Sequence, residues 1–224
     1  MRVLVCAALI SSAALPGAPS RSPPVVQVEP ARGVSRARVE QVEEACRAIG
    51  ALLGAGRRLD LGLAQASSVD DFAQETRRAR FEAAAMVGRV LWLQPSSVLE
   101  RLPDVEAILR HECVHAWLRA LDVPPLPATL EEALACGLAG QVARLPPGAP
   151  LSRAELVPSD GALRAPRDPG AAQHALSRAA STFWPRLRAL HQSGELVDTL
   201  RRAARGPVWT DALWDAMTAA PDPR

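Results

Sequence analysis

The segment PDVEAILRHECVHAWLRALDVPP, residues 103–125, constrains the fold more than any other part of the chain. Pro103 and Asp104 predict the start of a helix, with Asp104 as its N-cap, and Asp122 followed by Val-Pro-Pro predicts its end. Apolar side chains lie almost all round the helix between these signals. Because a helix that is hydrophobic on every side is buried, we expect other elements to cover it.

The segments before this helix alternate between helical and strand patterns. Residues 35–53 and 67–80 have helical spacing, and the second begins with a capping serine. RRLDLGLAQ (57–65) alternates leucine with polar residues, and MVGRVLWLQP (86–95) is rich in β-forming residues, so both are predicted strands. The order helix, strand, helix, strand, followed by helices, predicts an α+β fold with a small sheet.

The second half of the chain is predicted to be helical around one long loop. Residues 128–144 contain many small residues at helical spacing, whereas residues 146–170 are rich in proline, glycine and aspartate and predict a surface loop. A kink is expected at Pro185 in the first of three further helices. These tail helices are predicted at 171–193, 194–204 and 208–219.

The N-terminus has the order of a secretion signal. Arg2 precedes an apolar run at 3–15, and small residues and prolines follow. The run is shorter than the ~20 residues that a spanning helix needs. We therefore expect a signal peptide at 1–18, an irregular lead-in at 19–35, and an exported bacterial protein, periplasmic or extracellular, without a membrane span after cleavage. The alternative is a buried N-terminal helix or strand.

Composition limits the possible partners but does not decide whether the cysteines form a disulfide. The net charge of +2 gives no reason to expect nucleic acid as a partner, and 48% apolar residues are enough for a core. Export would leave Cys46, Cys113 and Cys136. Either one disulfide forms beside a free thiol, or all three are buried thiols, and the sequence does not choose the pair.

The predicted buried helix carries the chemistry in HECVH. His111 and His115 differ by about 40° around the helix axis and ~6 Å along it, so both can reach one metal ion such as Zn²⁺. Glu112 flanks that point and can take a proton from a water molecule, as in HExxH metallopeptidases. Cys113 points away from it. In the alternative without metal, the motif is an accident in a helical interaction protein.

A catalytic zinc ion commonly takes three protein ligands and leaves one position for water. The next predicted helix begins with LEEALACGLA, residues 130–139. Glu132 shares a helix face with Ala135 and Cys136, small residues that let two helices approach, so helical phase favours Glu132 as the third ligand. Glu131 is the alternative, and in a further interpretation both carboxylates only stabilise the helix N-terminus.

HECVHAWL followed by LPATLEEALACGLAG resembles the gluzincin pattern HExxHxxL…LPxWLxEGLAxY of bacterial peptidase MA-like domains. The resemblance implies a compact zincin-like core at 36–145, with 171–220 as a helical part of the same domain. It implies that the strand 87–93 is a sheet edge that pairs with an extended peptide. It also implies Glu112 as the general base and zinc bound by His111, His115 and Glu132.

The chain departs from this pattern at several positions. Thr129 and Ala133 stand where the pattern has tryptophan and glycine, and the chain has no tyrosine for the downstream helix in which the family often has one. His174 lies in that slot and is a candidate donor to a developing oxyanion. His191 is predicted to lie near a helix C-terminus.

These features together predict an exported zinc metallopeptidase that hydrolyses a peptide or protein substrate. Zinc-activated water is the expected nucleophile, with Glu112 as general base. Two alternatives keep the zincin fold: a catalytically inactive binding protein that retains zinc or only the fold, and a zinc amidase that acts on a non-peptide amide. The oligomeric state is not predicted.

Overall fold

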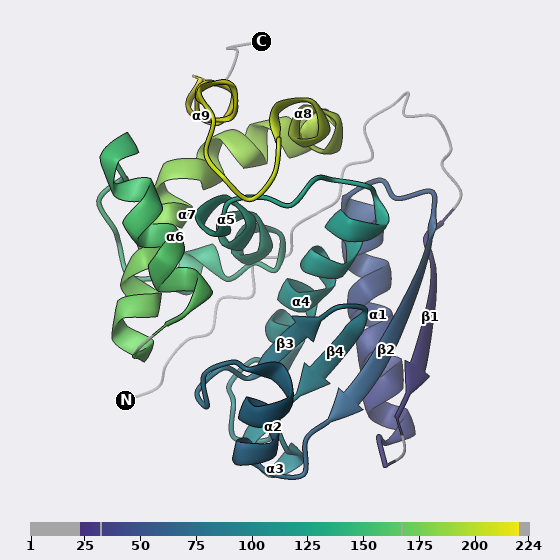
Figure 1. Cartoon of the computed structure of the whole chain (residues 1–224). Helices are drawn as coiled ribbons and strands as arrows, with labels where there is room; N and C mark the ends of the chain where they lie inside the picture. The colour runs from purple at the N-terminus through teal and green to yellow at the C-terminus, as the bar shows by residue number, and fades with distance from the viewer. Residues whose placement is uncertain (1–22, 32, 167, 220–224) are drawn as a thin grey trace, which may run out of the picture.

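The computed structural model describes residues 23–31, 33–166 and 168–219. Four strands form a single sheet, and helices cover it and extend from one end (Figure 1). The expected α+β class is therefore confirmed. The predicted signal peptide at 1–18 lies outside the described residues, so export stays a prediction. No helix of the described part is long and apolar enough to cross a membrane.

The sheet has the strand order β1-β2-β4-β3. β1 (Val25–Pro30), β2 (Arg58–Gln65) and β4 (Val90–Leu93) are parallel, and β3 (Ala84–Val87) runs antiparallel to β4 at one edge. The predicted alternation in β2 is confirmed, because its three leucines are all buried on one face. That face packs on the helices.

The irregular lead-in predicted at 19–35 is wrong, because it contains β1. The strand pairs with β2 over its whole length, from Val25 opposite Arg58 to Pro30 opposite Leu63. As an edge strand it buries only Val28, so the alternation that marks a strand is weak in its sequence.

The predicted strand 86–95 is two strands joined by a tight hairpin. Gly88 and Arg89 form the turn, and Gly88 has φ +60°, a conformation that glycine adopts without strain. β4 lies between β2 and β3, so the expectation that 87–93 is the sheet edge is also wrong. The edge on this side is β3.

Two helices pack side by side on the leucine face of the sheet, α1 (Arg36–Leu52) and α4 (Val105–Ala120) (Figure 1). Ser35 caps α1, and Asp104 caps α4 by accepting a hydrogen bond from the backbone N–H of Ala107 at 2.9 Å. As predicted, α4 is buried on nearly every side.

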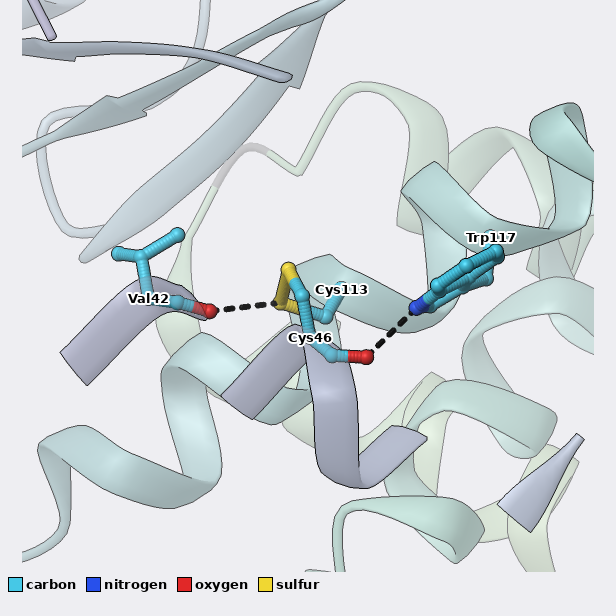
Figure 2. Close-up of a disulfide and its surroundings, with 4 residues drawn as sticks. All are labelled: Val42, Cys46, Cys113 and Trp117. Carbon is cyan, nitrogen blue, oxygen red and sulfur yellow. Dashed lines mark hydrogen bonds between the residues drawn. A yellow bond between two sulfur atoms is a disulfide. The ribbon is translucent and has the colours of Figure 1, made fainter. Parts of the chain in front are cut away.

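A disulfide between Cys46 and Cys113 joins α1 to α4 (Figure 2). One turn further on, the indole Nε1 of Trp117 donates to the carbonyl oxygen of Cys46 at 2.6 Å. Of the two possibilities that the sequence left open, the structure shows one disulfide and one free, buried thiol, Cys136. The disulfide thus cross-links α4, the helix that carries HECVH and is called the metal-motif helix below, to α1.

The remaining helices lie on the other face and at one end of the sheet. Phe72 of α2 (Val69–Thr76) packs on the second face against Ala66 and Ala85. α5 (Ala128–Leu138) packs against α4 and against the long α7 (Pro169–Gln192), which runs through Pro185 as one helix. The other short helices are α3 (Ser96–Leu99), α8 (Leu196–Ala203) and α9 (Asp211–Thr218).

The surface loop predicted at 146–170 is wrong in its second half, where α6 (Leu156–Arg164) forms. Ser152 and Glu155 make a capping box just before it. Pro158 lies in its first turn, where a helix needs no backbone N–H. Asp160 of α6 accepts hydrogen bonds from the backbone and the hydroxyl of Thr129, both at 2.7 Å, which anchors α6 to α5.

Candidate metal centre

The structure brings the side chains of His111, Glu112 and His115 together on the face of α4 that is directed toward α5 and β3. The rings of His111 and His115 have their centroids 5.0 Å apart. Potential ligand atoms of His111, Glu112 and His115 all lie within 4.8 Å of one another. Glu112 and His115 are only 9% and 8% exposed, so these polar groups need partners close by.

Glu132 on α5 faces both imidazoles, as its helical phase predicts. Its Oε2 lies 3.1 Å from Nε2 of His111, and its Oε1 lies 3.7 Å from Nε2 of His115. Two nitrogens and a carboxylate from two different helices therefore converge on one point. Such a set of donors can hold a divalent metal ion.

The second nitrogen of each imidazole has its own acceptor. Nδ1 of His111 lies 3.0 Å from Oε1 of Gln141, and Nδ1 of His115 lies 2.8 Å from Oε1 of Glu131. Both acceptors favour the tautomer with the proton on Nδ1, which leaves both Nε2 atoms directed toward Glu132. Glu131, the alternative ligand in the sequence, thus lies behind His115 and orients it.

Charge and burial work against each other in this cluster. Burial opposes a charge on His111, but the sulfur of Cys136 and the carboxylate of Glu132 raise its pKa well above the ordinary value. For His115, burial again opposes the charge, but the hydrogen bond to Glu131 and the nearby charge of Glu132 together raise the pKa. Burial would raise the pKa of Glu132, but the neighbouring imidazoles lower it to about 2. The carboxylate is therefore ionised at neutral pH.

A cavity of about 590 Å³ opens over this cluster. The strand β3 and the loop before it form one wall, α4 and α5 form the floor, and α6 and α7 supply residues from the opposite side. Among the lining residues, Phe81 is an exposed aromatic side chain, and Glu82 is a carboxylate whose pKa is raised by burial. The cavity can admit a substrate to the motif.

His174 does not join the site. It is exposed on α7 and does not line the cavity, whereas its neighbours Gln173 and Leu176 do. The phase of α7 turns His174 away, so the expectation that it donates to an oxyanion finds no support in its position. His191 lies in the last turn of α7, as expected.

Several polar residues of the site were not identified from the sequence, among them Gln141, Glu82 and Arg78. Gln141 follows Gly140, whose φ of +75° ends the helix and turns the chain back toward His111. Glu82 and Arg78 lie between α2 and β3, in a segment without regular structure. For Gln141, a signal was present in the glycine that follows the small-residue helix.

Comparison with models of known protein families, with curated proteins and with solved structures found no match to this chain.

Proposed function

We propose that the protein is a zinc-dependent peptidase whose metal ligands are His111, His115 and Glu132. One observation carries the proposal. The Glu132 carboxylate faces both Nε2 atoms, while side-chain oxygens of Gln141 and Glu131 lie within hydrogen-bond distance of the two Nδ1 atoms. An isolated ion pair would not need two imidazoles with this orientation. Metal-ligating histidines typically have such an acceptor on their other nitrogen.

The residues present fit zinc in number and type. Structural zinc sites are closed by four protein ligands, whereas catalytic sites have three and keep a position for water. Here three donors meet at the floor of an open cavity. The arrangement favours a catalytic over a structural ion.

Glu112 is the proposed general base. When bound, zinc would polarise the carbonyl of the scissile bond and make a water molecule more acidic. The Glu112 carboxylate lies beside the ligand atoms and is buried. It accepts a proton from the attacking water and then delivers that proton to the leaving amine.

The edge of β3 supports a peptide as substrate. The backbone N–H of Gln94 donates to the carbonyl oxygen of Ala83, so Ala83 and Gln94 form a hydrogen-bonded pair of the β3–β4 ladder. In the next pair, Ala84 and Leu93, the carbonyl oxygen of Leu93 accepts from Ala66 just after β2, so this pair is not hydrogen-bonded. By this alternation Ala84 and Met86 direct N–H and C=O away from β4, and both line the cavity. An extended peptide can bond to this free edge beside the metal site.

One observation favours the inactive alternative, a zinc-binding protein without turnover. The chain has no tyrosine, and His174 lies outside the cavity, so neither of the two donors considered in the sequence stands over the motif. Activity measurements decide between the two.

The test compares Glu112→Gln with the parent protein and with Glu106→Gln, an exposed glutamate on the same helix. We expect Glu112→Gln to retain zinc but to lose roughly 10²–10⁴-fold in peptide cleavage, the usual contribution of a general base. Glu106→Gln should cleave like the parent. A Glu112→Gln protein that cleaves at the parent rate would refute the mechanism.

A further inference from the structure

Three guanidinium groups line the cavity over the motif, those of Arg78, Arg119 and Arg164. Within the part of the chain that the structure describes, none of them has a carboxylate oxygen within 4.0 Å, whereas Arg110 on α4, outside the cavity, pairs with Glu106. Cations without a bound anion in a substrate cavity point to an anionic group on the ligand.

Of the three, Arg119 lies on the same helix as the two histidines. It follows His115 by one helical turn, as His115 follows His111, so the three side chains form a stripe along α4 with a rise of ~6 Å between neighbours. Its Nη1 donates to the carbonyl oxygen of Gly88 at 2.8 Å, at the hairpin that ends β3. Arg119 therefore lies between the metal site and one end of the free strand edge.

Three of the four carboxylates that line the cavity have partners of their own, and the fourth is Glu112, the proposed base. Glu131 is bonded to His115, and Glu132 faces the two imidazoles. Oε1 of Glu82 accepts from the backbone N–H of Ala79 at 3.1 Å. The charge of Arg78 also reaches Glu82 and Glu132. A guanidinium carries five N–H donors, and Arg119 directs one nitrogen to Gly88, so donors remain for a carboxylate.

We propose that Arg119 binds a carboxylate of the substrate, with Arg78 and Arg164 adding to the positive potential, so that the site selects peptides that carry a carboxylate near the scissile bond. The proposal rests on the peptidase function proposed above. The carboxylate has two possible sources with the same chemistry, an acidic side chain or a free C-terminus. The first would make the protein selective for acidic sequences, and the second would make it a carboxypeptidase.

The experiment measures peptide binding by calorimetry to the full-length zinc-loaded Glu112→Gln protein, which does not consume the peptide. The probes are a neutral hexapeptide amide, the same amide with one glutamate placed at each position in turn, and the neutral hexapeptide with a free C-terminal carboxylate. We expect one carboxylate-bearing probe to bind about tenfold more tightly than the neutral amide, the size of a charged hydrogen bond. Which probe gains identifies the source.

Arg119→Gln in the same background should abolish this gain and leave the affinity for the neutral amide unchanged. Arg89→Gln is the matched control, because Arg89 lies exposed in the same hairpin but does not line the cavity. It should keep the gain. A purely structural role of Arg119 would weaken all probes alike, which would overturn the proposal.

Two further results separate this proposal from the proposed function. Equal binding of all probes by the Glu112→Gln protein, together with cleavage of neutral peptides by the parent protein, refutes the carboxylate site and leaves the peptidase intact. A carboxylate preference of the Glu112→Gln protein that depends on Arg119, together with a parent protein that cleaves no peptide, supports the site and refutes the peptidase. A gain that survives Arg119→Gln contradicts the assignment to Arg119.

Discussion

Glu131 and Glu132 are neighbours in the chain, yet they meet opposite sides of the same histidine. Glu132 approaches Nε2 of His115 and Glu131 approaches Nδ1. Successive residues of a helix point about 100° apart, and the ring of His115 reaches between them. One residue thus supplies a proposed ligand and the next orients the ring that binds beside it.

Glu131→Gln should therefore weaken zinc binding without abolishing it. The amide oxygen can still accept from Nδ1, but the charge that makes the imidazole more basic is lost, and such partners typically contribute 10–100-fold to metal affinity. We expect a loss of about tenfold, measured by competition with a chelator. An unchanged zinc affinity would show that Glu131 does not orient His115.

Zinc binding should release protons at neutral pH. The pKa values of His111 and His115 are raised, so each imidazole keeps its second proton to a higher pH than an ordinary histidine, and this proton must leave before Nε2 can bind a metal. The affinity should therefore rise with pH through the raised pKa. Calorimetry in buffers of different ionisation enthalpy should show about one proton or more released per zinc ion. A heat that does not depend on the buffer would contradict this.

At this scale the site was predictable where helical geometry applies. The spacing of His111 and His115 and the phase of Glu132 depend only on helix geometry, and the structure places all three as expected. Gln141 lies beyond a glycine with positive φ, where helical phase no longer holds. His174 was assigned by its place in a pattern, and its orientation depends on how α7 packs, which the sequence does not show.

At the scale of elements, close helix packing places the proposed Glu132 ligand. A Cβ atom added to Gly137 of α5 would come within 2.0 Å of the ring of Trp184 on α7. The missing side chain lets the two helices approach closely, which sets α5 against α7 on one side and against α4 on the other.

Gly137→Ala should consequently destabilise the protein by about 1–3 kcal/mol, because the indole ring must move. Gly161→Ala in α6 is the control, since a Cβ atom there meets nothing within 4 Å. That change should be neutral or stabilising by up to about 1 kcal/mol, as expected for alanine in a helix. Urea unfolding measures both, and equal effects would refute the packing argument.

The elements that were predicted correctly have strong local signals. The strand β2 shows clear alternation, and the helices α1 and α4 show helical spacing and N-caps. The edge strand β1 was missed because it buries a single side chain. The helix α6 was missed because it contains proline and glycine. The position of β3 at the edge is a matter of strand order, which depends on long-range pairing.

At the scale of the whole molecule, one hydrophobic core joins the sheet, the two central helices and the C-terminal helices. It reaches from Val28 in the first strand to Met217 in the last helix. Near the C-terminus, Phe183 stacks on Trp209 with centroids 4.9 Å apart, and Trp214 meets both rings edge-on. The metal-motif helix lies in the middle of this core.

The disulfide restrains this core across 67 residues of sequence. Replacing Cys46 and Cys113 together with alanine should lower the free energy of unfolding by about 2–4 kcal/mol, since the unfolded chain regains the freedom of a long loop. A reducing agent should destabilise the parent protein by a similar amount and leave the double variant unchanged. A parent protein insensitive to reduction would show that the disulfide contributes little.

The account depends on the metal ligands, and X-ray absorption at the zinc edge tests them directly. The spectrum of the zinc-loaded protein should show two imidazole nitrogens and carboxylate or water oxygens at about 2.0–2.2 Å, and Glu132→Ala should alter this shell or lose the metal. A sulfur neighbour at about 2.3 Å would place Cys136 in the site instead. That result, or a protein that takes up no zinc, would contradict the central claim.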